Sequence, residues 1–181
     1  MCEQSRRTFL KVAATSVAGL SLHELIAPEA GSATAVQDNW RWCRKCQGLW
    51  FNGSPTNGVC PAGGVHDLTG SGNYVLTVNG ATGGQQDNWR WCHRCEGLWF
   101  NGNPTNGACP AGGDHASTGS GDYSLTVNAS AAGMQDNWRW CIKCEGLWFN
   151  GDATSGRCPA GGSHKDSRGR DFSGNYALAS R

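Results

Sequence analysis

The chain has 181 residues, including 27 glycines, 10 cysteines and 9 tryptophans, and its formal net charge is +1. This near-neutral balance gives no electrostatic footprint for nucleic acid or for an anionic lipid surface, so neither is expected as a partner. No stretch of the chain is apolar for long enough to span a membrane.

The chain begins with a basic motif that leads into a modestly apolar stretch. The run S-R-R-T-F-L-K occupies residues 5–11, and residues 12–22 follow it, too few and too rich in small residues for a spanning helix. The pattern Ala33-Thr34-Ala35 then offers a cleavage site before Val36. Together these features resemble a twin-arginine (Tat) export signal of bacterial type. The alternative is an ordinary amphipathic helix at the N-terminus.

The resemblance implies that residues 1–35 are a signal peptide recognised by the Tat export machinery. The protein is then expected to be periplasmic or extracellular. Removing this segment leaves the formal net charge at +1, because it holds three basic and three acidic residues. The twin-arginine route carries folded proteins, so a metal would be bound before the cysteines meet an oxidising compartment.

Three repeats follow this segment. The blocks Q-D-N-W-R-W-C-x-x-C-x-G-L-W-F-N-G and C-P-A-G-G-x-H recur almost unchanged, and each unit closes with G-x-Y-x-L. The joins between units are rich in Gly and Ala, as flexible linkers are. We therefore expect a first repeat at 36–79, a linker with the second repeat at 80–128, and a linker with the third repeat at 129–181.

Each repeat carries three cysteines and one histidine in the spacing C-x2-C-x13-C-x5-H. A unit this small, with few aliphatic residues, needs a metal or disulfides to be stable, and Cys3His closes a tetrahedral zinc site. Disulfides would leave one cysteine of each unit unpaired and the histidine without a role. We predict three zinc ions, or a similar thiophilic metal, one per repeat. The predicted ligands are Cys43, Cys46, Cys60 and His66, then Cys92, Cys95, Cys109 and His115, then Cys141, Cys144, Cys158 and His164.

The turns around these ligands are typical of zinc ribbons. A glycine lies two positions after the second cysteine, as in Cys46-Gln47-Gly48, where a zinc knuckle needs a residue that tolerates positive φ. The segment from Cys60 to His66 predicts a rigid turn followed by two permissive glycines. The resemblance to zinc ribbons is limited to this knuckle chemistry.

Short strands are the expected secondary structure. In the first repeat they are predicted at 40–42, 48–51 and 74–78, with Asn52-Gly53 as the turn after the second. We predict a small all-β, metal-stabilised fold made of three tandem zinc-ribbon-like beads. The alternative is a β-trefoil-like closure of the three units around a pseudo-threefold axis.

All nine tryptophans lie in the repeats, three in each. Such large rings can form the core of a bead that has few aliphatic residues. Alternatively, some rings stay exposed and hold a sugar or a polymer surface, with avidity from three linked units. The candidate binding residues are Trp40, Trp42, Trp50, Trp89, Trp91, Trp99, Trp138, Trp140 and Trp148.

No repeated acid–base pair remains once the metal ligands are set aside, so no enzyme is expected. Four protein ligands leave a tetrahedral zinc no open position, and a thiol–disulfide role of C-x-x-C is the remaining catalytic alternative. The longer segment after His164 predicts either a modified terminal repeat or a specialised contact loop. We expect a secreted, non-enzymatic zinc-binding protein that binds a glycan, a polymer or a cell surface. The alternative is a structural or protein-interaction module, including an inhibitor.

Overall fold

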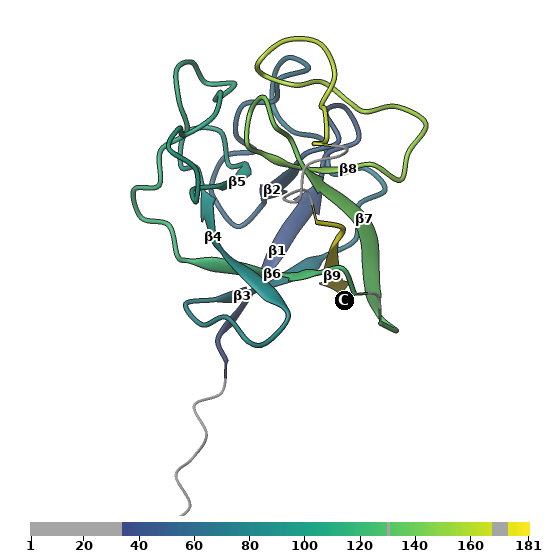
Figure 1. Cartoon of the computed structure of the whole chain (residues 1–181). Coiled ribbons are helices and arrows are strands. Elements are labelled where there is room, and N and C mark those ends of the chain that lie inside the picture. Colours follow the sequence, from purple (N-terminus) through teal and green to yellow (C-terminus); the bar gives the residue numbers. More distant parts are fainter. Residues whose placement is uncertain (1–33, 130, 168–173) are drawn as a thin grey trace, which may run out of the picture. The chain divides into compact units, whose positions relative to one another are not determined.

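A computed structural model describes residues 34–129, 131–167 and 174–181. The predicted signal peptide lies almost wholly outside these residues, as does most of the longer segment after His164. The described residues form nine strands (Figure 1). Within them, no helix is long and apolar enough to cross a membrane.

Each repeat contributes three antiparallel strands of matching length. They are β1 (Val36–Trp42), β2 (Leu49–Phe51) and β3 (Tyr74–Val78), then β4 (Gln85–Trp91), β5 (Leu98–Phe100) and β6 (Tyr123–Val127), then β7 (Met134–Trp140), β8 (Leu147–Phe149) and β9 (Tyr176–Ser180). In every repeat the long first strand pairs with both others, so that Trp40 lies opposite Phe51 on one side and Tyr74 on the other. The two hairpin-like pairings bring the loops of the repeat to one end of the long strand.

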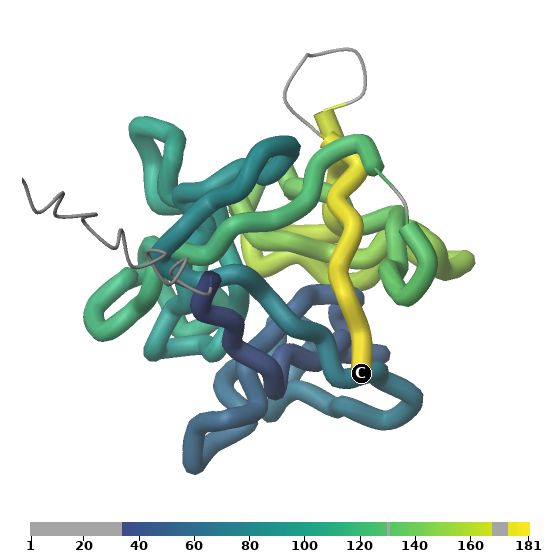
Figure 2. The backbone as a smooth tube through the Cα atoms, turned by 90° about the horizontal axis from the view of Figure 1, so that it is seen from below, coloured from purple at the N-terminus to yellow at the C-terminus, as the bar shows by residue number. Residues whose placement is uncertain are grey.

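The three repeats share a single sheet. Their last strands pair with one another, β3 with β6, β6 with β9 and β3 with β9. At the other end of the long strands, bridges join Trp50 to Gly97, Trp99 to Gly146 and Trp148 to Gly48. Figure 2 shows the repeats as three lobes around a common centre. The small all-β class is therefore confirmed, with the repeats closed about a pseudo-threefold axis as in the predicted alternative.

Aromatic residues and leucines form the core between the repeats. Each fully buried Trp40, Trp89 or Trp138 meets a tyrosine of a neighbouring repeat edge-on, and the ring centroids of Trp40 and Tyr123 are 5.0 Å apart. The tyrosine hydroxyl donates to a glutamine in the repeat of that tryptophan, as Tyr123 Oη does to Gln37 Oε1 at 2.5 Å. These hydrogen-bonded partners are at least 61 positions apart in the chain. The core therefore exists only when the repeats are assembled.

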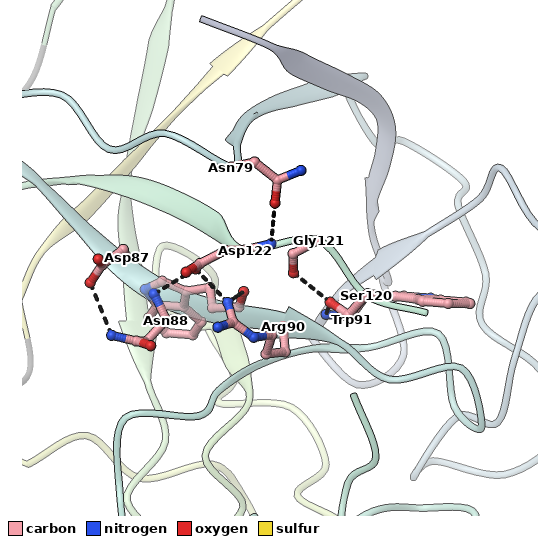
Figure 3. Close-up of polar contacts among 9 residues, drawn as sticks. Asn79, Asp87, Asn88, Arg90, Trp91, Ser120, Gly121 and Asp122 are labelled. Atoms are coloured by element: carbon pink, nitrogen blue, oxygen red, sulfur yellow. Dashed lines mark hydrogen bonds and ion pairs between the residues drawn. The ribbon is translucent and has the colours of Figure 1, made fainter. Parts of the chain in front are cut away.

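A polar network ties the long strand of each repeat to the turn before its last strand. In the second repeat, Asp122 accepts a hydrogen bond from the backbone N–H of Asn88 at 2.8 Å and forms an ion pair with Arg90 (Figure 3). Asn73 and Asn175 accept the corresponding backbone hydrogen bond in the other repeats, also at 2.8 Å. The arginine that recurs between two tryptophans thus serves the structure of its own repeat.

The join between the first two repeats is also hydrogen-bonded. The backbone N–H of Asn79 donates to the carbonyl of Asp122 at 2.7 Å, and the N–H of Gln85 donates to the carbonyl of Thr82 at 3.1 Å. Residues 79–84 therefore form a turn that contacts the second repeat directly.

Candidate metal centres

The four candidate ligands of each repeat converge on one point. Their sulfur and nitrogen atoms all lie within 4.8 Å of one another, and all twelve residues are buried. The first two cysteines lie in the turn between the first and second strands, and the third cysteine and the histidine lie in the long loop that leads to the last strand. Two turns distant in the sequence thus face each other across each group.

The distances between these atoms match a tetrahedral zinc site. In the first repeat the Sγ atoms of Cys43 and Cys60 are 3.9 Å apart, and Cys46 Sγ lies 3.6 Å from His66 Nδ1. With zinc bonds of about 2.3 Å to sulfur and about 2.0 Å to nitrogen, a tetrahedron separates two sulfurs by about 3.8 Å and a sulfur from a nitrogen by about 3.5 Å. The other two repeats have corresponding distances of 3.8–3.9 Å and 3.6 Å. A disulfide needs about 2.0 Å between its sulfurs, and the nine cysteines are free thiols.

The electrostatics of each group also favour a cation. Hydrogen bonds with Cys46 and Cys60 lower the pKa of Cys43, while hydrogen bonds with Cys43 and Cys60 raise the pKa of Cys46. At His66, burial disfavours the charged ring, but hydrogen bonds with Cys43 and Cys60 outweigh it and raise the pKa to about 9. Three thiols so close together cannot all ionise against one another. A divalent cation removes this conflict, because it binds all three as thiolates.

Neighbouring groups hold the ligands in position. The imidazole of His66 is stacked on Trp50, with ring centroids 5.2 Å apart and planes 15° from parallel. The backbone N–H of Asp67 donates to Cys43 Sγ at 3.4 Å. Both contacts recur in the second and third repeats. The third tryptophan of each repeat therefore orients a metal ligand, in the way that outer contacts fix the ligands of known metal sites.

One detail of the predicted knuckle is wrong. The positive φ lies at Gln47, at 66°, and at its counterparts Glu96 and Glu145, rather than at the glycine that follows. The side chain of Gln47 is tethered because it accepts a hydrogen bond from Trp42 Nε1 at 2.9 Å, which helps to hold the strained backbone. The glycine instead forms the bridge to the neighbouring repeat.

Each candidate metal centre contacts the next repeat. His66 Nε2 lies 3.2 Å from the carbonyl oxygen of Cys95, a ligand of the second group. Gly58 is packed against the same carbonyl, and the backbone N–H of Phe51 donates to the carbonyl of Glu96 at 2.8 Å. The close glycine and the backbone hydrogen bond recur from the second repeat to the third and from the third to the first. The three centres thus form a closed ring of contacts.

The nine candidate tryptophans take three different places, and most of them belong to the interior. Six of them are at most 2% exposed, because they form the core or stack on the ligand histidines: Trp40, Trp50, Trp89, Trp99, Trp138 and Trp148. These six cannot present a face to a partner. The middle tryptophan of each repeat keeps a partly exposed ring: Trp42, Trp91 and Trp140.

The partly exposed tryptophans lie at the junctions between repeats. Trp42 meets Phe149 of the third repeat with ring centroids 6.5 Å apart, and Trp91 meets Phe51 of the first repeat at 6.3 Å. Sequence reasoning missed Gln47 and Glu96, whose side chains accept hydrogen bonds from the indoles of Trp42 and Trp91. The signal was present, since a side chain with a carbonyl or carboxylate group follows the second cysteine in every repeat.

Comparison with models of known protein families, with curated proteins and with solved structures finds no match for the chain. The fold and the sites alone therefore define its class. It is a small all-β protein of three repeats, each with a buried Cys3His group placed to bind a metal ion.

Proposed function

We propose that this protein is an exported, zinc-stabilised, non-enzymatic binding protein that recognises a glycan or a similar surface polymer. The observation that carries the proposal is the tetrahedral spacing of four buried protein ligands in every repeat. Four protein ligands complete the coordination of zinc and leave no position for a substrate or a reactive water. Zinc then has a structural role, and residues at the protein surface carry out the binding.

Zinc fits the donor set better than other metals do. Thiolate sulfur and imidazole nitrogen are its preferred ligands in closed structural sites, and three thiolates with one imidazole form one of the common sets. The burial of all twelve ligands shields them from competing oxidants and chelators. Export of the folded protein by the twin-arginine route agrees with this, since zinc would protect the thiols before they leave the cytoplasm.

The partly exposed tryptophans are the best candidates for contacts with a polymer. Trp42, Trp91 and Trp140 are repeated at three junctions of one rigid unit, and Trp42 and Trp91 each pair with a phenylalanine of the neighbouring repeat. A flat aromatic ring beside amide side chains is suited to the apolar face and the hydroxyl groups of a sugar. Repeated weak sites on one body also gain from effective concentration on a repeating ligand.

Native mass spectrometry of the protein from the exported fraction tests the metal proposal. We expect three zinc ions per chain and nine thiols that resist alkylation until a chelator is added. A metal-free protein with disulfides would refute it. Amino-terminal sequencing of the same sample, with Val36 as the expected first residue, tests the export signal.

A glycan array with the zinc-loaded protein tests the proposed ligand. We expect binding to neutral glycans, and a triple variant with Trp42, Trp91 and Trp140 replaced by alanine should bind none of them. The three single variants, checked for zinc content, serve as controls for folding. Binding that is confined to proteins, with no glycan retained, would favour the protein-interaction alternative.

A further inference from the structure

A cavity of about 210 Å³ opens at the junction between the second and third repeats. The second repeat lines it with residues of β4, β5 and the loop after β5, and the third repeat with the last residue of β7 and the first of β9. The lining residues are Gln86, Phe100, Gly102, Asn103, Trp140 and Tyr176. None of the six carries a charge. Three aromatic side chains and two primary amides thus surround a space smaller than the roughly 300–1,000 Å³ of pockets for drug-sized ligands.

The indole of Trp140 differs from its two counterparts. Trp42 Nε1 donates to Gln47 at 2.9 Å and Trp91 Nε1 donates to Glu96 at 2.7 Å, so both rings are tethered. Trp140 Nε1 is buried without a hydrogen-bond partner. An unpaired buried donor is costly. Six other indole N–H groups of the described residues are also unpaired, but among these tryptophans only Trp140 lines the cavity, where a ligand can supply an acceptor.

The missing tether has a structural cause. Glu145 corresponds to Gln47 and Glu96, but one of its carboxylate oxygens accepts a hydrogen bond from Thr105 of the second repeat, and the other is buried without a partner. Because Thr105 of the second repeat takes one carboxylate oxygen, Glu145 does not hold the Trp140 indole as Gln47 and Glu96 hold theirs. At the junction between the first and second repeats the hydroxyl of Ser54 donates to Glu96 at 2.8 Å, but this carboxylate also accepts the hydrogen bond from the Trp91 indole.

The remaining polar groups define the ligand. Tyr176 Oη donates to Gln86 Oε1 at 2.5 Å, which leaves the amide N–H groups of Gln86 to donate to a ligand. Asn103 adds a second amide, which also contacts the Glu145 carboxylate, where the other repeats have Ser54 and Asp152. The cavity thus offers N–H donors, an amide oxygen and aromatic faces, without a charge. A ring that bears hydroxyl groups and has one apolar face matches this combination.

We infer that this cavity is a sugar-binding subsite that takes one neutral sugar residue of a glycan chain. The inference rests on the proposed glycan-binding function and locates it at one of the three junctions. The sugar ring lies against Trp140 and Phe100, and its hydroxyl groups bond to Gln86, Asn103 and the indole N–H. The other two junctions serve at most as weaker contacts, because their tryptophans are held in place within the protein.

Isothermal titration calorimetry of the zinc-loaded full chain tests the subsite, with chitotetraose, cellotetraose and mannotetraose as probes. Two variants alter the cavity, Trp140→Phe, which removes the N–H but keeps a ring, and Asn103→Ser, which introduces the residue of the first repeat. Ser54→Ala is the matched control at the junction between the first and second repeats, and Trp91→Phe measures how much that junction adds to binding. Zinc content and circular dichroism establish that each variant is folded.

We expect one probe to bind at one site per chain. Its Kd should be at least tenfold weaker in both cavity variants, changed less than twofold in Ser54→Ala, and weakened less by Trp91→Phe than by either cavity variant. Binding that is weakened equally by Trp91→Phe, or that saturates at three sites per chain, would overturn the subsite while leaving the glycan function intact. If no probe binds and the glycan array is also blank, both the subsite and the proposed function fail.

Discussion

Replacing Gly58 with alanine tests whether the repeats are locked together through their candidate metal centres. Gly58 has a φ of 61°, and a Cβ atom there would lie 2.2 Å from the carbonyl oxygen of Cys95 in the next repeat. Gly64 is the matched control, because its φ is 65° and a Cβ atom would meet nothing within 4 Å. The two substitutions impose the same left-handed strain, and only Gly58→Ala adds a clash between repeats.

The expected magnitudes follow from this geometry. A left-handed alanine costs about 1–2 kcal/mol, partly offset by about 0.4–1 kcal/mol because alanine restricts the unfolded chain. Gly64→Ala should therefore lower the free energy of unfolding by about 1 kcal/mol. A Cβ atom rarely approaches another atom within 3.0 Å, so Gly58→Ala must displace the knuckle backbone at Cys95. Overpacking of this kind costs about 1–3 kcal/mol, which brings the expected total for Gly58→Ala to about 3 kcal/mol.

Urea unfolding of the zinc-saturated proteins, followed by tryptophan fluorescence, measures both values. A second readout is the rate at which a chelator removes zinc, which should rise in Gly58→Ala at the second repeat, where Cys95 is a ligand. If the two variants differ by less than about 0.5 kcal/mol in the free energy of unfolding, the reasoning is refuted, because separate beads would feel only the left-handed strain.

Three further predictions concern the metal ligands and the core. Chelation at neutral pH should abolish the β-sheet circular dichroism and shift tryptophan emission to the red in one transition for all repeats; a native spectrum after zinc removal would argue against a structural metal. His115→Ala should bind two zinc ions and unfold at a lower urea concentration than the parent, and an unchanged midpoint would contradict the coupling between centres. Burial raises the pKa of Tyr74 to about 12 and that of Tyr176 still further. Since the folded state favours the neutral phenol, this stabilisation is complete below the ordinary pKa of about 10 and is lost as the pH rises through about 12. Tyrosinate absorbance measures the titration, and a pKa of about 10 for all tyrosines of the native protein would contradict the prediction.

The candidate ligands could be predicted from the sequence because metal coordination imposes a local and discrete pattern. The strands were predicted less completely. The predicted strand at 40–42 is only the end of β1, which begins at Val36. The pairing of β1 with β3 shifts register between Gln37 and Trp40, where Asn39 has a φ of 66°. This bulge interrupts the alternation of side chains that identifies a strand in a sequence.

The closure of the repeats could not be derived from one unit, because the residues that make it resemble ordinary turn residues. Gly58 precedes a cysteine in a loop, and only the carbonyl of Cys95, 37 positions away, explains why a side chain is excluded there. The burial of Trp40 likewise depends on Tyr123 of another repeat. Near-identical repeats give no indication of whether such contacts form within a unit or between units.

Zinc and ring closure make separate contributions to this fold, and each depends on the other. The metal would fix two turns of a repeat that is too small to bury a core of its own. Closure then provides the core, because each last strand pairs with both of the others and no strand of that inner triangle is left unpaired. A chain cut after Val127 would keep two complete Cys3His groups, yet β3 and β6 would lose their pairing with β9 and Trp89 would lose Tyr176. Such a fragment should bind two zinc ions and still associate or aggregate through the exposed strand edges, which sedimentation would detect. A soluble, monomeric two-repeat fragment would show that the zinc sites alone suffice for folding and that the third repeat is not needed to complete the core.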